Sequence, residues 1–600
     1  MSERFAVPYN DFVLPFMIGM VFVLIFLFIG LVKIIKDLPG RDRKKFFLLF
    51  VNPKRLALSI KDIFADCLFH VKIFKKNFLL GYMHMSIALG WFMLIVIGHI
   101  EVWLYTPQRL SLFYYPIFFR YFVAETSYTL RGSFFFFLMD FFLLMVLSGV
   151  ALAMFKRVRS KMLGMRRTTK ASLPDLIAMY SLWAIFPLRL LAESFTAGIS
   201  GGSFLTKPMF WIFSNFLSKD YHIVPTWWAY SIALGAFLVA LPFSRYMHIP
   251  TEIILILMRN AGIKVSSHRK GYAETQIYSC SSCGICIDAC PMGIHRKNLK
   301  YSSVYYMRFV RRRNKIKSGA IADKCLMCGK CVAACPVGVE SCDLKRAFRA
   351  TVPYKIEQNY NYTEEINIPK IKGKVLYYAG CMTHLTPSIK SSISGILDKA
   401  GIEWSFMDQD GGLCCGRPLK LAGKTESAQK LIDENKRLIK ESGANTLLLS
   451  CPICYKVFKE EYGLGAINVI HHSVFLLNLL KEKRISLEKN DFKYVFHDPC
   501  ELGRGSGIYE EPRQIIGCMG NLVDAEVQKS ESICCGGSIG SITLSYEDRK
   551  HITDSSLRAL NYNHPDVILT ACPLCRKTFS SQSATRIADI SEIVNEQIKQ

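Results

Sequence analysis

Residues 280–291 read CSSCGICIDACP, and residues 325–336 read CLMCGKCVAACP. Both stretches follow the spacing C-x2-C-x2-C-x3-C-P, and their first cysteines are 45 residues apart. Three closely spaced thiolates can bind one corner of a metal cluster, whereas a fourth cysteine held away by three residues and a proline points elsewhere. The repeat therefore predicts a pair of metal clusters that exchange their fourth ligands.

The spacing is that of bacterial ferredoxins with two [4Fe-4S] cubane clusters, which this stretch resembles. It assigns one cluster to Cys280, Cys283, Cys286 and Cys335 and the other to Cys325, Cys328, Cys331 and Cys290. Zinc is the alternative, because C-x2-C pairs also bind zinc, but zinc explains neither the repeat nor the two Cys-Pro ends. We expect an α-rich two-cluster ferredoxin module over residues 261–351.

The cysteines are distributed very unevenly along the chain. Of 21 cysteines in 600 residues, only Cys67 precedes residue 280. A secreted disulfide scaffold does not concentrate its cysteines in this way, so metal ligation in a reducing compartment is the better explanation. Cys67, Cys342 and Cys518 belong to no motif, and we expect them to be ordinary residues.

The C-terminal half contains one cysteine pattern twice. The first copy consists of Cys381, the Cys414-Cys415-Gly416 triplet, and Cys451 with Cys454. The second copy consists of Cys500, Cys534-Cys535-Gly536, and Cys572 with Cys575, so that matching cysteines are 119 to 121 residues apart. Strand-like runs alternate with helical stretches in both copies. This constant offset predicts a duplicated α/β unit over residues 371–485 and 490–600, after a polar linker near 352–370.

Adjacent cysteines are poor ligands for a single tetrahedral ion, yet they can bind neighbouring irons of a larger cluster. The glycine after each pair allows close approach of the backbone. These copies resemble the CCG domains of the catalytic part of heterodisulfide reductase, and the resemblance implies two non-cubane four-iron clusters. The residues that it implies as ligands and as the catalytic site are Cys381, Cys414, Cys415, Cys451 and Cys454 in the first copy, and Cys500, Cys534, Cys535, Cys572 and Cys575 in the second. One or two such clusters are expected.

Five apolar stretches in residues 1–260 are long enough to cross a bilayer core of about 30 Å. They lie near 11–35, 79–104, 133–155, 173–197 and 223–247. The first is too long for the apolar core of a signal peptide and lacks a small-residue cleavage site. The sequence therefore predicts an all-α bundle of five transmembrane helices in a multidomain, multi-pass protein.

Basic residues set the expected orientation in the cytoplasmic (inner) membrane. Lys and Arg are concentrated in the loops at 36–77 and 156–170 and are scarce in the alternate loops. The positive-inside rule then places the N-terminus outside and the iron–sulfur domains in the cytoplasm. The same rule accounts for much of the net charge of +27, so nucleic-acid binding is not expected.

Histidines at matching depths suggest a haem site. We expect His84 and His248 near the inner surface, where two imidazoles could ligate one haem b. His99 and His222 lie near the outer surface, where a second haem is possible. For either pair the alternative is that the histidines only cap a helix or snorkel to the interface.

The membrane region resembles the five-span cytochrome b subunit of respiratory nitrate reductase. The resemblance rests on the histidine of the second span, on Arg189-Leu-Leu-Ala-Glu193, and on Trp227-Trp228 leading to Arg245 and His248. Tyr230 stands where that family has its second histidine of the last helix, which counts against an outer haem. Arg189 and Glu193 are one helical turn apart, so they could pair with each other or contact a quinone or a haem propionate.

The whole chain most resembles a membrane heterodisulfide reductase whose haem b and iron–sulfur subunits are fused. This resemblance implies an oxidoreductase that passes electrons between menaquinone, or another quinone, and disulfide chemistry in the cytoplasm. The alternative is a quinone reductase that accepts electrons from a soluble redox protein, such as electron-transfer flavoprotein or a hydroxy-acid dehydrogenase. His384, His497 and Asp498 lie next to ligand cysteines and could donate protons, or the His497-Asp498-Pro499 stretch could only shape a turn. No Gly-rich dinucleotide motif follows a strand, so NAD or FAD is not expected.

Overall fold

The structure is a computed structural model that divides the chain into two compact units, residues 1–284 and 285–600. The division passes through the first cysteine run, because Cys280 and Cys283 belong to the first unit and Cys286 and Cys290 to the second. The predicted linker near 352–370 lies outside the described residues except for Val352. The residues that the structure describes are 9–105, 113–124, 130–159, 167, 169–216, 219–294, 300–352, 374–409, 411, 413–537 and 540–599.

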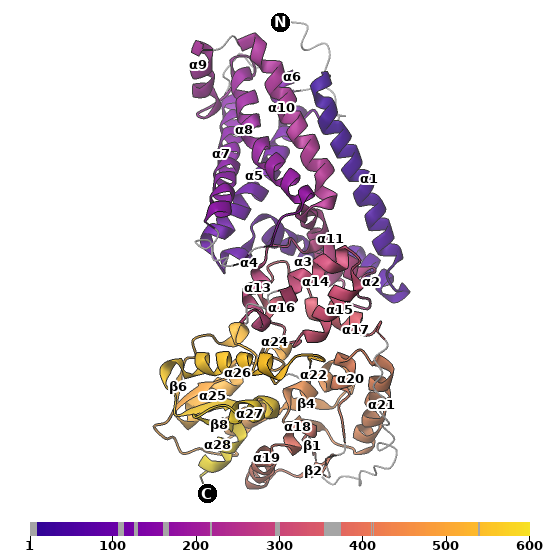
Figure 1. The fold of residues 1–600 in the computed structure, drawn as a ribbon, viewed down its shortest axis with the longest axis vertical. Coiled ribbons are helices and arrows are strands. Elements are labelled where there is room, and N and C mark those ends of the chain that lie inside the picture. Colours follow the sequence, from indigo (N-terminus) through magenta and orange to yellow (C-terminus); the bar gives the residue numbers. More distant parts are fainter. Residues whose placement is uncertain are drawn as a thin grey trace. The chain divides into compact units, whose positions relative to one another are not determined.

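The first unit is a bundle of long apolar helices (Figure 1). Five segments are long and apolar enough to span a membrane: Asp11–Lys36, Phe78–Tyr105, Gly132–Val158, Leu173–Ser200 and His222–Phe243. The five predicted spans are thereby confirmed. The unit consists of α1 (Leu14–Lys36), α2 (Gly40–Val51), α3 (Pro53–Ile63), α4 (Val71–Phe74), α5 (Phe78–Tyr105), α6 (Phe119–Phe122), α7 (Leu130–Val158), α8 (Leu173–Ser200), α9 (Thr206–Phe216), α10 (Lys219–Ala240), α11 (His248–Asn260) and α12 (Tyr272–Ser279).

The last span is shorter than the sequence predicts. Helix α10 ends at Ala240, and two short 3-10 turns separate it from α11, which begins at His248. Pro242 lies in the first of these turns and lacks the backbone N–H that a continuing helix requires. Asp175, in the capping box of α8, accepts a hydrogen bond from the Arg245 backbone at 2.7 Å. His248 is therefore the first residue of a separate helix and does not close the fifth span.

The second unit begins with short helices that carry the ferredoxin-type cysteines, as the prediction of an α-rich module requires. Glycines with left-handed backbone conformation lie in the cysteine loops between these helices. Gly329 (φ 71°) lies just before α16, and Gly338 (φ 77°) follows the second Cys-Pro pair. The helices are α13 (Ile285–Ala289), α14 (Ser303–Arg311), α15 (Lys315–Lys324), α16 (Lys330–Ala334) and α17 (Ser341–Arg349).

Two four-stranded parallel sheets follow, and their strand orders match: β2-β1-β3-β4 and β6-β5-β7-β8. The predicted duplication of an α/β unit is therefore confirmed at the level of topology. The first copy contains β1 (Val375–Tyr378), α18 (Cys381–His384), α19 (Pro387–Lys399), β2 (Trp404–Phe406), α20 (Arg417–Leu421), α21 (Thr425–Glu441), β3 (Thr446–Leu449), α22 (Pro452–Glu461), β4 (Asn468–His471) and α23 (His472–Lys481). The second contains β5 (Lys493–Phe496), α24 (Gly503–Ser506), α25 (Glu510–Met519), β6 (Asn521–Val523), α26 (Tyr546–Leu560), β7 (Val567–Thr570), α27 (Pro573–Ser580), β8 (Arg586–Asp589) and α28 (Ile590–Gln597).

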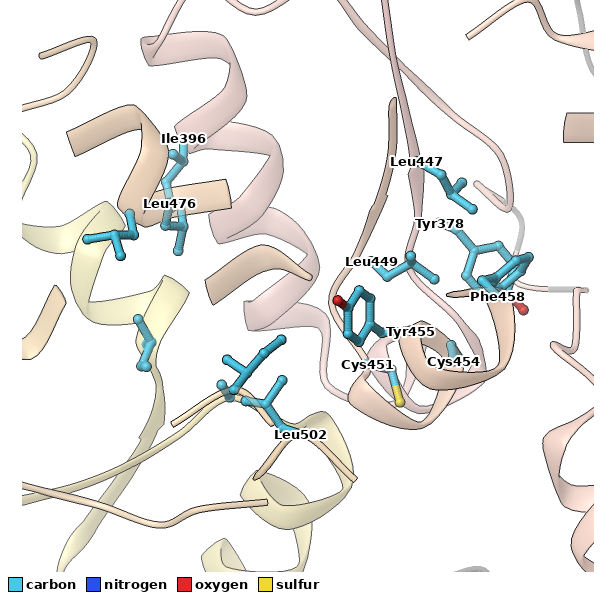
Figure 2. Packing of buried hydrophobic residues seen from close by; sticks show 14 of the residues in the cluster. Tyr378, Ile396, Leu447, Leu449, Cys451, Cys454, Tyr455, Phe458, Leu476 and Leu502 are labelled. Carbon is cyan, nitrogen blue, oxygen red and sulfur yellow. The ribbon is translucent and has the colours of Figure 1, made fainter. Parts of the chain in front are cut away.

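The two copies share one hydrophobic core. Leu447 and Leu449 of β3 belong to the same buried cluster as Leu502 and Ile515 of the second copy. Figure 2 shows part of this cluster, which includes Cys451 directly before α22. Burial of apolar surface at about 25 cal/mol per Å² makes such a shared core the main attraction between the copies. The cysteines next to this core are consequently fixed by close packing.

Candidate functional site: cysteine clusters at strand ends and helix starts

The four thiols assigned to the second cubane cluster lie together. Cys328 and Cys331 flank the start of α16, with Cys325 just before them, and Cys290 follows the end of α13. Burial, followed by the nearby thiols of Cys331, Cys328 and Cys325, raises the pKa of Cys290 to about 12. A thiol that resists ionisation in isolation becomes a ligand when a metal cluster supplies positive charge. This set of four sulfurs suits a [4Fe-4S] cube.

Both cysteine runs have the same backbone conformation. Ser282 (φ 54°) and Met327 (φ 56°), which precede the second cysteine of each run, are left-handed residues other than glycine. Each is followed two residues later by a left-handed glycine, Gly284 (φ 95°) and Gly329 (φ 71°). Strained positions of this kind persist where surrounding structure fixes them, and they concentrate at functional sites. Since Cys280 and Cys283 belong to the other unit, the ligand set of the first cubane cluster stays a prediction.

Helix α17 contributes side chains that the cysteine spacing does not reveal. The thiol of Cys342 lies within hydrogen-bonding reach of Cys325 and Cys331, and this contact lowers the pKa of Cys331 to about 5. The Lys345 ammonium lies 3.5 Å from the sulfur of Cys325 and donates to the Ser303 hydroxyl at 2.8 Å. Burial lowers the pKa of Lys345, but the surrounding thiolates outweigh it and raise that pKa above its usual range. The prediction that Cys342 is an ordinary residue therefore misses its place at this site.

Arg349, at the end of the same helix, connects separate parts of the second unit. Its guanidinium is fully buried and donates to the carbonyls of Cys325 at 3.1 Å, Leu421 at 2.7 Å and Gly540 at 2.6 Å. Cys342, Lys345 and Arg349 are three and four residues apart and so share one face of α17. That spacing, directly after a Cys-Pro pair, is the sequence signal that could have indicated their role.

In each cysteine-rich copy, the loops after three adjacent strands bring the thiols to one sheet edge. In the first copy, Cys381 follows β1, the Cys414-Cys415 pair follows β2, and Cys451 follows β3. The carboxyl ends of parallel strands lie at the same edge, where ligands bind in open α/β sheets. Cys415 accepts hydrogen bonds from the thiols of Cys414 and Cys454, which hold its pKa well below the usual range.

The second copy repeats this arrangement. Cys535 accepts hydrogen bonds from Cys534 and Cys575, and these bonds lower its pKa to about 6. Cys500 hydrogen-bonds Cys534, and burial further raises the pKa of Cys500 above its usual range. Cys572, at the start of α27, is buried beside them. All five predicted thiols of each copy therefore lie in neighbouring loops, and their role as ligands stays a prediction.

The glycines after the two Cys-Cys pairs are required by their backbone. Gly416 has φ 79° and Gly536 has φ 86°, a region that favours glycine. A Cβ atom at Gly536 would lie 2.8 Å from the Arg549 carbonyl oxygen, and one at Gly416 would lie 3.2 Å from that of Ala428. The close approach of each loop to the following helix thus explains why the Cys-Cys-Gly pattern occurs in both copies.

Thiols of the second copy line a small cavity at the boundary between the copies. Cys500, Cys534 and Cys572 line it together with Pro452 and Ile453 of the first copy. The proximity of Cys451 contributes to the raised pKa of Cys572, after burial. The cavity therefore belongs to the second set of thiols, and Cys451 of the first set lies near it.

The second cubane site adjoins the second copy. Arg504 donates to the Cys328 carbonyl at 2.8 Å and to the Ser532 carbonyl at 2.9 Å, so it ties a cubane loop to the loop before Cys534. Leu326 and Cys328 belong to one buried apolar cluster with Cys534. The thiols assigned to the second cubane cluster therefore lie next to the second cysteine-rich copy.

The histidines and the acid next to the cysteines have different surroundings. His384 lies 3.3 Å from the buried carboxylate of Asp408 and is partly exposed. His497 is fully buried against Phe579, and burial lowers its pKa to about 4. Asp498 accepts two hydrogen bonds from Arg513, at 2.7 and 2.8 Å. The turn-shaping interpretation therefore suits the His497-Asp498 stretch, whereas His384 is the histidine with access to solvent.

The first unit contains a histidine cluster that includes a residue not predicted from the sequence. The His70 and His84 rings are 5.3 Å apart in an edge-to-face arrangement. Burial, followed by the charge of nearby His248, lowers the pKa of His70 to about 4. His248 holds Arg245 O at 2.7 Å through Nδ1, which leaves Nε2 as the nitrogen suited to a metal. The predicted haem pair His84 and His248 therefore has His70 as a common neighbour.

The other predicted polar residues of the bundle fall into separate places. His99 is exposed on the bundle surface and contacts the Ile95 carbonyl of its own helix at 2.8 Å. His222 packs on Phe195, with ring centroids 5.9 Å apart. The buried pair Arg189 and Glu193 is joined at 2.9 Å, which accounts for both charges without a ligand. A second buried pair joins Arg120 and Glu101.

Comparison with known proteins matches the domains that contain these cysteines. Residues 267–339 match the family described as 4Fe-4S dicluster domain, and residues 375–459 and 494–580 each match the cysteine-rich domain family CCG. One subunit of the dihydromethanophenazine:CoB--CoM heterodisulfide reductase of Methanosarcina acetivorans is 27% identical over 332 residues, which are 53% of this chain and 75% of that protein.

Two further relatives differ in length from this chain. The EtfAB:quinone oxidoreductase of Syntrophomonas wolfei is 27% identical over 38% of this chain and 36% of its own length. The probable membrane-anchored ferredoxin of Chromohalobacter salexigens is 24% identical over 54% of this chain and 48% of its own length. The chain therefore spans about a third to a half of these two relatives. The chain therefore contains a 4Fe-4S dicluster domain and two CCG domains, and this part of it is similar to a subunit of heterodisulfide reductase.

Proposed function

We propose that this chain is a membrane-bound oxidoreductase that passes electrons from the quinone pool to the two cysteine-rich domains, where they reduce a disulfide. The observation that carries the proposal is the cavity that all five thiols of the second copy line together with Pro452 and Ile453 of the first, beside which Cys451 approaches Cys572. Four-iron clusters bound at the thiols of the two copies would supply one-electron transfers. A second set of thiols close to that cavity suits a substrate with two sulfur atoms.

The overall reaction balances with a quinol as reductant. A mixed disulfide RSSR′ and a quinol QH2 yield RSH, R′SH and the quinone Q, with two electrons and two protons transferred. His384 is placed to deliver a proton near Cys381, because it lies three residues after that cysteine on the same short helix, α18. Asp408 orients the His384 ring and is itself fixed by the backbone N–H groups of Ala379 at 2.8 Å and Gly380 at 2.7 Å.

A haem b between His84 and His248 would connect the quinone pool to the clusters. The Nδ1 contact of His248 with the Arg245 carbonyl supports this, because such a contact fixes the tautomer of metal-binding histidines. Intramembrane charges also support a redox role for the bundle, since they are costly and usually functional. The orientation proposed here has the N-terminus outside and the cysteine domains in the cytoplasm, as the basic loops favour.

A cavity at one end of the bundle suits a quinone ring. It has a volume of about 360 Å³ and is lined by Phe136, Lys207 and Trp211 among others. The Arg120 guanidinium lies 4.3 Å from the centre of the Phe136 ring and pairs with buried Glu101. Aromatic walls with a few placed polar groups are typical of sites for flat organic cofactors.

Anaerobic turnover tests this proposal. The full chain, purified in detergent with iron and haem counted, is reduced with a short-chain menaquinol and mixed with a low-molecular-weight mixed disulfide. We expect two thiols for each quinol consumed, and we expect loss of thiol formation in Cys415→Ser and in Cys535→Ser. Protein with a full iron content and reduced cubane clusters that forms no thiol from a panel of disulfides would contradict disulfide reduction.

A second candidate function rests on the similarity to the EtfAB:quinone oxidoreductase, whose name pairs EtfAB with a quinone. In that case the electrons move from a soluble partner through the clusters to the quinone pool. Reduction of the clusters by reduced electron-transfer flavoprotein, with quinol as the product and without any thiol formed from disulfides, would favour this direction.

A further inference from the structure

We propose that Lys345 is a positioning residue that raises the reduction potential of the second cubane cluster, bound by Cys325, Cys328, Cys331 and Cys290. This inference rests on the proposed function only in taking that site as an iron–sulfur site in an electron pathway. It adds a preferred place for the electron in that pathway, because it assigns the electron to the cluster that adjoins the cysteine-rich domains.

The ammonium of Lys345 is buried where a cation is costly. The residue is 2% exposed, and its Nζ atom lies 3.5 Å from the sulfur of Cys325. Its other contacts are the Ser303 hydroxyl at 2.8 Å and the face of the Tyr306 ring, whose centroid is 5.8 Å away. Within the described part of the chain, no carboxylate forms an ion pair with Lys345. The neighbouring charge that could compensate it is therefore that of the thiolates.

The cost of burial implies an anionic partner. Removing an ammonium from water costs several kcal/mol unless an opposite charge compensates it. A hydroxyl and an aromatic face recover only part of that energy. A four-iron cluster held by four thiolates is anionic in both redox states and gains one further negative charge on reduction. A fixed cation at its ligand therefore stabilises the reduced state more than the oxidised state and raises the potential.

The surroundings hold the cation in place. Helix α17 is anchored at its end by the buried Arg349, which also donates to the Cys325 carbonyl at 3.1 Å. The position that corresponds to Lys345 after the first run is Lys300, because each lies ten residues after the fourth cysteine of its run. Lys300 is exposed. The chain thus offers a lysine of equivalent sequence position that lacks the buried environment.

The charge of Lys345 matters because the second cubane site lies beside the second cysteine-rich copy. Arg504 joins the Cys328 carbonyl to the loop before Cys534, so the second cubane site is next to the second cysteine-rich copy. A higher potential at this site favours residence of the electron there. The electron then waits beside the cavity that the two cysteine-rich copies share.

Potentiometric titration monitored by EPR tests the proposal on the full chain, purified anaerobically with iron counted. Lys345→Met removes the charge and keeps a similar volume, whereas Lys345→Arg keeps the charge. We expect one cubane step of the Met variant to move to lower potential by at least a tenfold change in its reduction equilibrium, about 59 mV for one electron. The other cubane step stays in place, the Arg variant titrates close to wild type, and Lys300→Met, the matched control, titrates as wild type.

Three outcomes decide the proposal. Wild-type potentials in a Met variant with full iron content would overturn it, as would an equal shift in Lys300→Met. If the Met variant loses iron, Lys345→Gln, which retains a hydrogen-bond donor for Ser303, is titrated instead, and the same downward shift is required of it. Failure of the proposed function looks different, because cubane iron would be absent from the wild-type protein or disulfides would not react while the shift remained.

Discussion

The guanidinium of Arg417 lies 3.1 Å from the carboxylate of Glu501, and this ion pair joins the two cysteine-rich domains directly beside their thiols. Arg417 follows the Cys-Cys-Gly triplet of the first copy, and Glu501 follows Cys500 of the second. Burial alone would raise the pKa of Glu501, but Arg417 and then Lys456 hold it below its usual range. The carboxylate is therefore charged and depends on its partners.

Replacement of Arg417 by Met should destabilise the cysteine-rich domains by about 3 kcal/mol, because removal of one partner leaves a buried charge poorly compensated. Lys456 lies 3.7 Å from Glu501 and compensates only in part. Thermal unfolding of the purified protein measures the change. The double variant Arg417→Met, Glu501→Gln should recover a substantial part of the loss, since the buried carboxylate charge is then removed together with its partner. Arg437→Met, in an exposed ion-pair network, is the control and should leave the unfolding temperature unchanged.

The iron content should fall by one cluster when the thiol that accepts hydrogen bonds from its neighbours is removed from one cysteine-rich copy. Cys415→Ser and Cys535→Ser each remove the sulfur that accepts two hydrogen bonds from neighbouring thiols. We expect each variant to lose about four of about sixteen irons per chain, one cluster of the kind that the thiols would bind. Colorimetric iron analysis after anaerobic purification measures this. The exposed Cys518 belongs to neither set, and Cys518→Ser should keep all of its iron. Equal iron in all three variants would remove the assignment of clusters to these domains.

Stability should fall with pH below neutrality in part because of His497. Burial lowers the pKa of this histidine to about 4 in the folded protein, against about 6.5 when it is unfolded. The unfolded chain therefore binds the extra proton first, so the contribution of His497 is complete above pH about 6.5 and is lost as the pH falls towards 4. The unfolding temperature measured between pH 7 and pH 5 should decline less steeply in His497→Gln. His551→Gln, at an exposed position of α26, should follow the wild-type slope.

Replacement of Arg349 by a residue without the several N–H donors of a guanidinium group should lower the stability of the protein. Met at this position leaves the carbonyls of Cys325, Leu421 and Gly540 without their donor, and each lost hydrogen bond to a buried group costs about 1–3 kcal/mol. Lys keeps the charge but reaches fewer acceptors. We expect both variants to unfold at lower temperature, with Met the more severe. Arg346→Met, in an ion pair with Asp343, should unfold like wild type. A stable Arg349→Met protein would contradict the role of this side chain as a connector.

The parts of the fold that depend on local periodicity could be predicted from the sequence. Apolar runs of about 20 residues indicate membrane spans, and the two cysteine runs together with the constant 120-residue offset of Cys415 and Cys535 indicate the module and the duplication. Hydropathy extends the fifth span to residue 247, because apolar character continues past the point where Pro242 ends the helix. Hydropathy registers side chains and not backbone hydrogen bonds.

Other site residues could not be predicted from the sequence for a different reason. Cys342 and Lys345 reach the second cubane site because α17 folds back onto a loop about 20 residues earlier, and His70 reaches His84 from a left-handed turn with φ 49°. Such contacts depend on tertiary approach, and the spacing of Cys342 and Lys345 indicates only that the two residues share a helix face. A lysine that would ordinarily be assigned to a solvated helix face is instead completely enclosed.

The common core of the two cysteine-rich domains limits how the gene can be shortened. Leu447 and Leu449 from one copy and Leu502 and Ile515 from the other lie in the same buried cluster. A fragment that stops between the copies would expose this apolar surface to water and should aggregate or require a substitute partner. Natural split versions of such a protein would therefore be expected to break before residue 374, where the first sheet begins, and to inherit both halves on one polypeptide.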